Sequence, residues 1–190
     1  MPERSPGRLA VVTVRDAALG VEFEIDPRFV RTDAAGPDDD PYAGGVPAAL
    51  PSAHFIASSP AAGWIAALAI VAVESEAGPG EDWLEPHLAR ARAAFAAWSP
   101  ASHAMLVPPE AARLAGRPAA HVRYRLAGGA LEDASGAFAG ETPPTLVDSW
   151  TVRVAERDWL LALELMVQPP EHWEREREAF ELPFRSLDLV

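Results

Sequence analysis

The sequence predicts an α+β domain in which an antiparallel β-sheet is flanked by helices. Segments with strand character dominate the chain, and two segments of helical periodicity interrupt them in the order β-β-β-α-β-β-β-α-β. Successive strand segments are joined by hairpin-like connections, which is typical of an antiparallel sheet. The chain has 190 residues, of which 49% are apolar, so residues 1–190 fit a single domain with a sizeable core.

The first strand segments are short and end at proline. Residues 9–14 are rich in β-branched side chains, and residues 20–25 alternate apolar and acidic side chains, as a half-buried strand does. Asp26-Pro27 ends the second segment because proline cannot donate to the strand ladder. Extended chain then resumes at Phe29 and Val30.

A long loop separates these segments from the next two strands. Residues 33–52 contain four aspartates and repeated glycine and proline, which predicts a flexible acidic loop. Residues 53–58 follow as a short strand. Residues 64–73 are a continuous apolar run between turn residues, which predicts a strand buried on both faces.

The clearest helix lies in the middle of the chain. Apolar side chains recur there at helical spacing: Leu84, Leu88, Ala91, Phe95 and Trp98. This spacing places them in one stripe along one side of the helix. Ser99-Pro100 ends it, because proline disfavours a helical residue before it.

The second half of the chain predicts further antiparallel strands. Residues 105–107 precede a turn at Pro108-Pro109, residues 119–126 form a strand, and residues 127–143 form a second loop. A hairpin follows, with residues 146–154 paired to residues 159–167. Its predicted register sets Trp150 against Leu163 and Val152 against Leu161.

The other face of this hairpin carries Thr151, Arg153, Leu160, Ala162, Glu164 and Met166. That face is too apolar to be bare, so we expect another element to cover part of it.

A last helix begins near Glu171 and turns Trp173, Phe180 and Phe184 inward. Pro183 is expected to close it, and residues 186–190 predict a short final strand.

Composition argues against several classes of function. A net charge of −12 and a pI of about 4.8 disfavour nucleic acid and anionic membranes as partners. The chain has no cysteine, which removes disulfides and thiolate chemistry. The longest apolar stretch, residues 61–73, is shorter than the roughly 20 residues that span a bilayer. Residues 1–8 lack signal-peptide features, so a cytoplasmic protein is expected.

No catalytic or metal-binding motif stands out. The five histidines have no metal-ligand spacing, and no nucleophile elbow or phosphate-binding loop is present. The run Asp38-Asp39-Asp40 lacks the alternate ligands of a calcium loop. We therefore expect no catalytic residues, no metal and no cofactor.

Two groups of residues are candidates for binding. Arg123 and Arg125 share a strand face, and with Arg153 they predict a basic patch on an otherwise acidic protein. Such a patch suits an acidic or amphipathic protein partner, although cross-strand pairing with acids such as Glu164 is the more ordinary explanation of these arginines. Aromatic side chains such as Trp64, Trp98 or Trp150 are candidates to line a ligand pocket.

Short motifs near both ends of the chain resemble a known superfamily. The segment Gly20-Val21-x-Phe23-x-Ile25-x-Pro27-x-Phe29 resembles the opening strand of Mog1/PsbP-like proteins, and most closely their actinobacterial LpqN-like and DUF1795-like branch. Gly116-Arg117-Pro118-Ala119 before Tyr124, and Asp148-Ser149-Trp150, resemble later strands of that pattern. The resemblance implies an α/β/α sandwich and a binding or assembly role. It supplies no functional residues, because its motifs shape strands.

The first hypothesis is therefore a non-catalytic adaptor or chaperone-like protein that binds a protein partner through a sheet face. A small-molecule binder with an aromatic-lined pocket is the second, and a hydrolase with a site assembled from dispersed residues is the third. The sequence leaves open whether the protein forms a homodimer.

Overall fold

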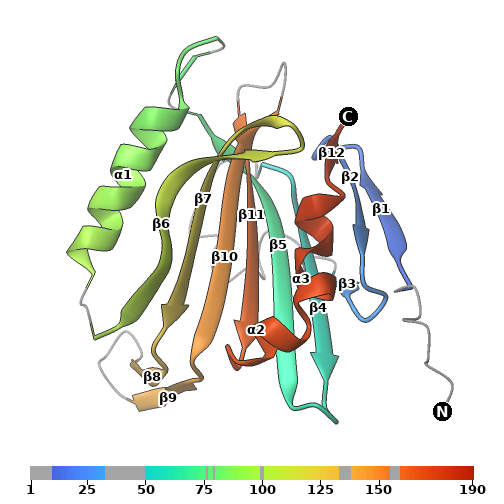
Figure 1. The fold of residues 1–190 in the computed structure, drawn as a ribbon, viewed down its shortest axis with the longest axis vertical. Coiled ribbons are helices and arrows are strands. Elements are labelled where there is room, and N and C mark those ends of the chain that lie inside the picture. Colours follow the sequence, from blue (N-terminus) through green and yellow to red (C-terminus); the bar gives the residue numbers. More distant parts are fainter. Residues whose placement is uncertain are drawn as a thin grey trace, which may run out of the picture.

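The computed structural model describes residues 10–32, 50–75, 77–78, 80–98, 101–132, 138–154 and 159–190 (Figure 1). The main sheet contains β3 (Val30–Thr32), β4 (Ser52–Ser59), β5 (Trp64–Glu74), β6 (His103–Leu114), β7 (Arg117–Leu126), β10 (Thr145–Arg153) and β11 (Trp159–Gln168). Its seven strands lie in the order β3-β4-β5-β11-β10-β7-β6, and every neighbouring pair is antiparallel.

The remaining elements cover or extend this sheet. A second sheet, in the order β1-β2-β12, consists of β1 (Val12–Asp16), β2 (Val21–Ile25) and β12 (Asp188–Leu189). The hairpin of β8 (Gly129–Glu132) and β9 (Phe138–Thr142) lies between β7 and β10 in the chain. The helices are α1 (Leu84–Ala97), α2 (His172–Arg175) and α3 (Arg177–Arg185).

The main sheet has two unlike faces. The inner face carries Leu161, Leu163 and Leu165, which are fully buried. The α2–α3 segment and the β1-β2-β12 sheet lie on this side, and their apolar side chains join the same core (Figure 1). The outer face carries the alternate side chains of each strand, such as Glu164 and Met166, and α1 packs on it over β6 and β7.

The two sheets share one core. Phe23 of β2 meets Phe55 of β4 edge to face, with ring centroids 5.7 Å apart. Ser186, which follows α3, donates to and accepts from the backbone of Glu24, so the end of the chain is held against β2. Gly20 is required at the turn before β2, because its φ is +68° and a Cβ would lie 3.0 Å from the Val190 carbonyl oxygen.

The predicted antiparallel α+β architecture is confirmed, and so is the register of the central hairpin. Trp150 lies opposite Leu163 and Val152 opposite Leu161. Trp173, Phe180 and Phe184 are buried, as expected. The predicted loop at 33–52 lies outside the described residues, apart from residues 50–52, where Ser52 already begins β4.

Three details of the prediction were wrong. The apolar run of β5 is buried on the inner face only; Ile65 on the outer face is 44% exposed, since α1 covers β6 and β7 instead. Pro108-Pro109 does not end a strand, because β6 is an edge strand whose outward positions need no N–H donor and whose register shifts absorb the prolines. The predicted loop at 127–143 contains the β8–β9 hairpin.

The last helix also differs from its prediction. It is divided at Glu176 into α2 and α3, and Pro183 lies inside α3 rather than closing it. Proline costs one backbone hydrogen bond there. The helix continues because Pro183 is buried and the Ser186 N–H still donates to the Leu182 carbonyl at 3.0 Å.

Candidate functional site

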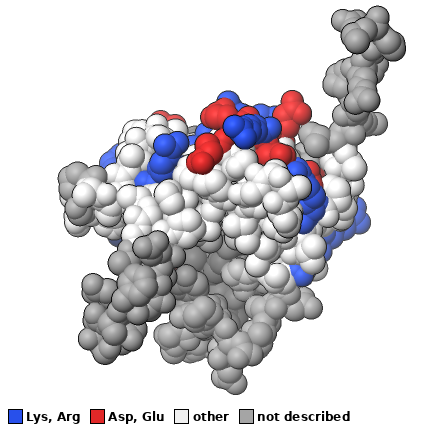
Figure 2. All heavy atoms as spheres, turned by 90° about the horizontal axis from the view of Figure 1, so that it is seen from below, with Lys and Arg blue, Asp and Glu red and all other residues white. Residues whose placement is uncertain are grey.

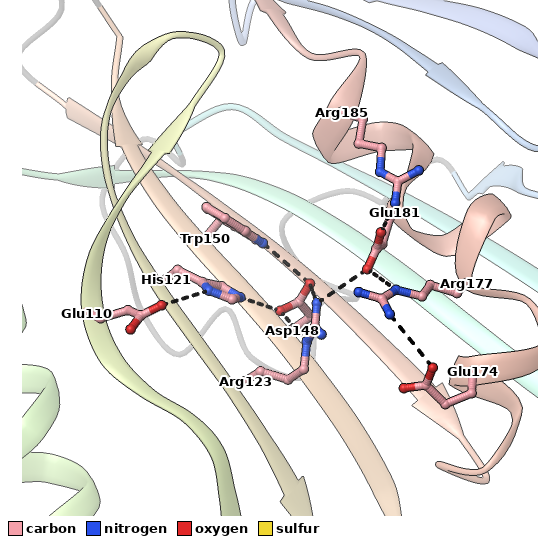
Figure 3. A network of polar contacts seen from close by, with 9 residues as sticks. All are labelled: Glu110, His121, Arg123, Asp148, Trp150, Glu174, Arg177, Glu181 and Arg185. Carbon is pink, nitrogen blue, oxygen red and sulfur yellow. Dashed lines mark hydrogen bonds and ion pairs between the residues drawn. The ribbon is translucent and has the colours of Figure 1, made fainter.

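A buried carboxylate, Asp148 of β10, is the centre of a polar network on the inner face (Figure 3). Its Oδ1 lies 2.7 Å from Nε2 of His121 and accepts a hydrogen bond from Nε of Arg123 at 3.0 Å. Its Oδ2 accepts from Nη2 of Arg123 at 3.0 Å and from the Trp150 indole at 3.4 Å. Strand register explains the cluster, because Asp148 lies opposite Arg123 and Trp150 opposite His121.

The environment of Asp148 keeps its carboxyl ionised. Burial alone would raise its pKa, since a charged group is less stable away from water. Hydrogen bonds from His121 and Arg123, together with the charge of Arg123, outweigh burial and hold the pKa of Asp148 below its ordinary value. The network therefore contains a permanent buried ion pair.

The His121–Asp148 pair has the form of a general base held by a carboxylate. The His121 ring stacks on Trp150 at 3.9 Å between centroids, and its Nδ1 lies 4.0 Å from Oε1 of Glu110. In the described part of the chain, no serine or threonine hydroxyl forms a hydrogen bond with His121. The described residues also bring no three histidine, aspartate or glutamate side chains together to hold a metal ion.

The network continues into the C-terminal helices. The Arg123 guanidinium lies over the Trp173 ring at 4.5 Å from its centroid and 3.9 Å from Oε1 of Glu181. Glu181 also pairs with Arg177, at 2.7 Å, and with Arg185. Figure 3 shows this chain of contacts running from β7 and β10 to α3. The arrangement anchors α2 and α3 to the inner face.

The predicted patch of three arginines does not form. Arg123 lies on the inner face and is engaged by Asp148, and Arg125 lies on the same face, opposite Leu146. Arg153 lies on the outer face, opposite Leu160, where it donates to Ser75 and to the carbonyls of residues 77 and 78. The sequence interpretation placed Val122 and Tyr124 on the same face as Val152. In the structure they lie opposite Ser149 and Val147, on the other face of β10. Of the three, only Arg125 is exposed without a partner among the described residues.

The candidate pocket tryptophans lie in three separate places. Trp150 belongs to the Asp148 network, and Trp98 packs with Phe95 and Tyr124 at the end of α1. Trp64 is buried beneath the Arg28 guanidinium, 4.9 Å from its ring centroid.

Trp64 also borders an open depression of about 300 Å³, with Pro60, Ile65, Pro143 and Pro169 among its lining residues. Figure 2 views this end of the molecule, with charged side chains of both signs along one edge and uncharged atoms over its middle.

A second candidate surface is the outer face of β3, β4, β5 and β11, which we call the open outer face. Its apolar side chains are Val30, Ile56, Ile65, Ala67, Ala69, Val71, Val73, Leu160, Ala162 and Met166. Its polar side chains are Thr32, Ser52, His54, Ser58, Glu164 and Gln168.

Much of the open outer face is accessible to solvent. Val30 is 65% exposed, Ile56 42% and Ile65 44%. The expectation that this side of the β10–β11 hairpin is partly covered is met, because Val147 and Thr151 of β10 and Leu160 of β11 are buried there. No described helix lies over the outer face of β4 and β5.

Sequence reasoning missed the Asp148 network, although one signal was present. Asp148 interrupts the apolar inner positions Leu146, Trp150 and Val152 of one strand. A charged residue at such a position requires buried donors. The donors on β7 were recognised as a face of positive side chains, but the register that pairs them with Asp148 was not predicted.

Comparison with known proteins identifies solved structures that share the fold of this chain. No protein-family model and no curated protein sequence matches the chain. Cyanobacterial PsbP (CyanoP) from Synechocystis sp. PCC 6803 matches with a TM-score of 0.55 and 13% identity, over 100% of this chain and 98% of that one. The Ran-binding protein Mog1p of Saccharomyces cerevisiae matches with a TM-score of 0.52 and 8% identity, over 96% and 97% of the two chains.

The chain has the Mog1/PsbP-like fold. LpqN of Mycobacterium tuberculosis, involved in cell envelope biogenesis, matches with a TM-score of 0.48 and 12% identity over 94% of this chain and 89% of that one. Likeness at that level carries no argument, so the resemblance to the LpqN-like branch stays a prediction from the motifs. Within the described ranges of this Mog1/PsbP-like chain, no helix is long and apolar enough to cross a membrane.

Proposed function

We propose that this protein is a non-catalytic adaptor that binds a protein partner through the open outer face. The observation that carries the proposal is the exposure of Val30, Ile56 and Ile65 on one sheet face whose side chains are mostly apolar. Contiguous exposed apolar surface on a folded protein is typical of an interaction site. By contrast, the side chains most suited to catalysis, His121 and Asp148, are bound to each other and to Arg123.

The fold supports the proposal without deciding it. Mog1p, which shares the Mog1/PsbP-like fold, is a Ran-binding protein. A fold hosts many functions, however, so the argument depends on the surface of this chain.

The experiment is affinity capture with surface variants. We expect the double variant Ile56→Asp/Ile65→Asp to lose a stoichiometric partner that the wild-type protein retains, because two buried carboxylates would have to be desolvated at the interface. The matched control is Val12→Asp on β1, where the side chain is 47% exposed on the other sheet. Circular dichroism checks that all variants are folded. Equal capture by the double variant and the control contradicts the proposal.

Arg125 is a candidate contact at a separate place, the inner face of β7, on the side of the main sheet opposite to the open outer face. It is exposed and makes no described ion pair, whereas Arg123 and Arg153 are both engaged. Such an arginine is suited to pair with an acidic group of a partner. We expect Arg125→Glu to slow association without changing the stability of the protein, measured by surface plasmon resonance with the captured partner. An unchanged association rate argues against Arg125 as a contact.

The depression beside Trp64 favours small-molecule binding as a second candidate function. Its lining includes three prolines, Ile65 and Trp64, and the Trp64 Nε1–H is buried without a hydrogen-bond acceptor in the described structure. A ligand that binds there stabilises the fold by mass action. A metabolite screen should then give a rise in melting temperature that Ser58→Trp, which places a large side chain in the depression, abolishes. A response unaffected by that substitution places the ligand elsewhere.

A further inference from the structure

The open outer face contains one charge. Glu164 lies on β11, at the side of this face that adjoins β10, opposite Ser149 of β10 on one side and Ala69 of β5 on the other. The side chains around it are mostly apolar and small, including Ala67, Ala69 and Ala162. Glu164 is the one formally charged residue on this side of β3, β4, β5 and β11, all of whose residues are described.

Glu164 has no cation of its own. None of the described residues gives it an ion pair or a hydrogen bond, and burial alone raises the pKa of its carboxyl. A half-buried acid is normally paired, because removing a carboxylate from water without a partner is costly. This carboxylate therefore suits an interaction that the isolated chain does not make.

Two alternative occupants are disfavoured by charge. A second copy packed face to face about a two-fold axis at this point would bring two Glu164 carboxylates together, which is repulsive. The segment between β3 and β4, residues 33–49, has four aspartates and no arginine or lysine in its sequence, so it supplies no complementary charge. A partner with a basic residue avoids the repulsion between carboxylates and supplies the complementary charge.

We propose that the open outer face binds an apolar segment of a partner protein that carries a single arginine or lysine, whose cationic group pairs with Glu164. This inference rests on the proposed function and names the chemistry of the partner. The apolar side chains supply affinity, and the Glu164 pair selects the segment and fixes its register on the sheet.

A displayed library of random 12-residue peptides, selected on the immobilised protein at about 0.15 M salt, tests the proposal without a known partner. We expect binders to be apolar with one arginine or lysine. Glu164→Gln should weaken them at least about tenfold in fluorescence anisotropy, as should replacing the basic residue of the peptide by norleucine. The two changes together should cost little more than either alone, because both remove the same pair.

Glu174→Gln is the matched control, since it removes the same charge from a side chain that is 77% exposed. It should leave peptide affinity within about twofold if the Glu164 pair, rather than the net charge, selects the binders. Equal weakening by both glutamine variants overturns the inference.

The remaining outcomes separate the two proposals. Binders that require Ile56 but ignore Glu164→Gln contradict the inference and leave the proposed function in place. If none of the selected peptides loses binding in the Ile56→Asp variant, both the inference and the proposed function are contradicted. A wild-type dimer that Ile56→Asp dissociates in sedimentation assigns the face to a second copy and overturns the inference.

Discussion

At the scale of single residues, Asp148 and Glu164 are carboxylates on opposite faces of one sheet, with opposite pKa shifts. Asp148 has two hydrogen-bond donors on β7 and a permanent positive charge beside it. For Glu164, burial is the one cause of the pKa shift. The two residues are therefore expected to change stability with pH in opposite directions.

Glu164→Gln should stabilise the isolated protein at pH 7. The folded-state pKa of Glu164 is raised, so its charged form costs stability above that pKa, and the cost disappears as the pH falls toward the unfolded value of about 4.3. Melting temperatures at pH 7 and pH 4 measure this. A variant that is no more stable than wild type at pH 7 would contradict the assignment.

Asp148→Ala should lower the free energy of unfolding by about 3 kcal/mol at pH 7, because it leaves Arg123 and His121 without their shared partner. The folded-state pKa of Asp148 is lowered, so its contribution is present above the unfolded pKa of about 3.9 and is lost as the pH falls through the folded value. Urea titrations at pH 7 and pH 3 check both statements.

The control is Glu22→Ala, which removes a surface partner of Arg15, a side chain that is 78% exposed. That change should cost less than about 1 kcal/mol. Similar losses for the two variants would mean that the Asp148 network adds no more than a surface pair.

At the scale of elements, the edge strand β6 is protected from pairing with another chain. Pro108 and Pro109 remove two donors, the register shifts twice along the strand, and Arg92 of α1 donates to the Pro109 carbonyl at 3.1 Å. Prolines and bulges of this kind prevent edge-to-edge association of sheets. The opposite edge strand, β3, has only three residues.

Replacing both prolines by valine should promote self-association, because it restores backbone N–H donors to a strand at the edge of the sheet. Sedimentation velocity at increasing protein concentration measures the change. The control Ala111→Val/Ala112→Val adds the same side chains to β6 and keeps the prolines. Association of the control to the same extent would attribute the effect to hydrophobicity.

The spacing of apolar residues predicted the helices and strands in which that spacing is regular and whose packing partners are close in sequence. The β10–β11 hairpin and its register follow from adjacent apolar runs, and α1 follows from its stripe. The pairing of β7 with β10 joins strands separated by the β8–β9 hairpin, and no local pattern sets that register. The Arg123–Asp148 ion pair, and the separation of Arg153 from it, depend on that register.

At the scale of the whole molecule, two sheets and the helices α2 and α3 share one hydrophobic core. The cluster contains Phe23 of β2, Phe55 of β4 and Phe180 of α3. On the inner face, α2, α3 and the β1-β2-β12 sheet cover the part of the main sheet around β4, β5 and β11, and on the outer face α1 packs over β6 and β7. The sequence indicated a layered α+β fold but not which part of a face lacks a cover, because that depends on where α1 docks.

Phe23→Ala should lower stability by about 3–4 kcal/mol, because Phe23 is fully buried at the junction of the two sheets. We expect wild type and variant to unfold in a single transition, since neither sheet has a core of its own. Far-ultraviolet and near-ultraviolet circular dichroism during urea unfolding should coincide. Two separate transitions would contradict a single domain.

The contact between Ser186 and Glu24 joins residues 162 positions apart. On the ribosome, at roughly 5–20 residues per second, β2 is made about 8–30 s before the segment that holds it. During that interval the apolar side chains Val21, Phe23 and Ile25 have no completed sheet to enter. We therefore expect β2 to be a segment that chaperones of nascent chains bind early in translation.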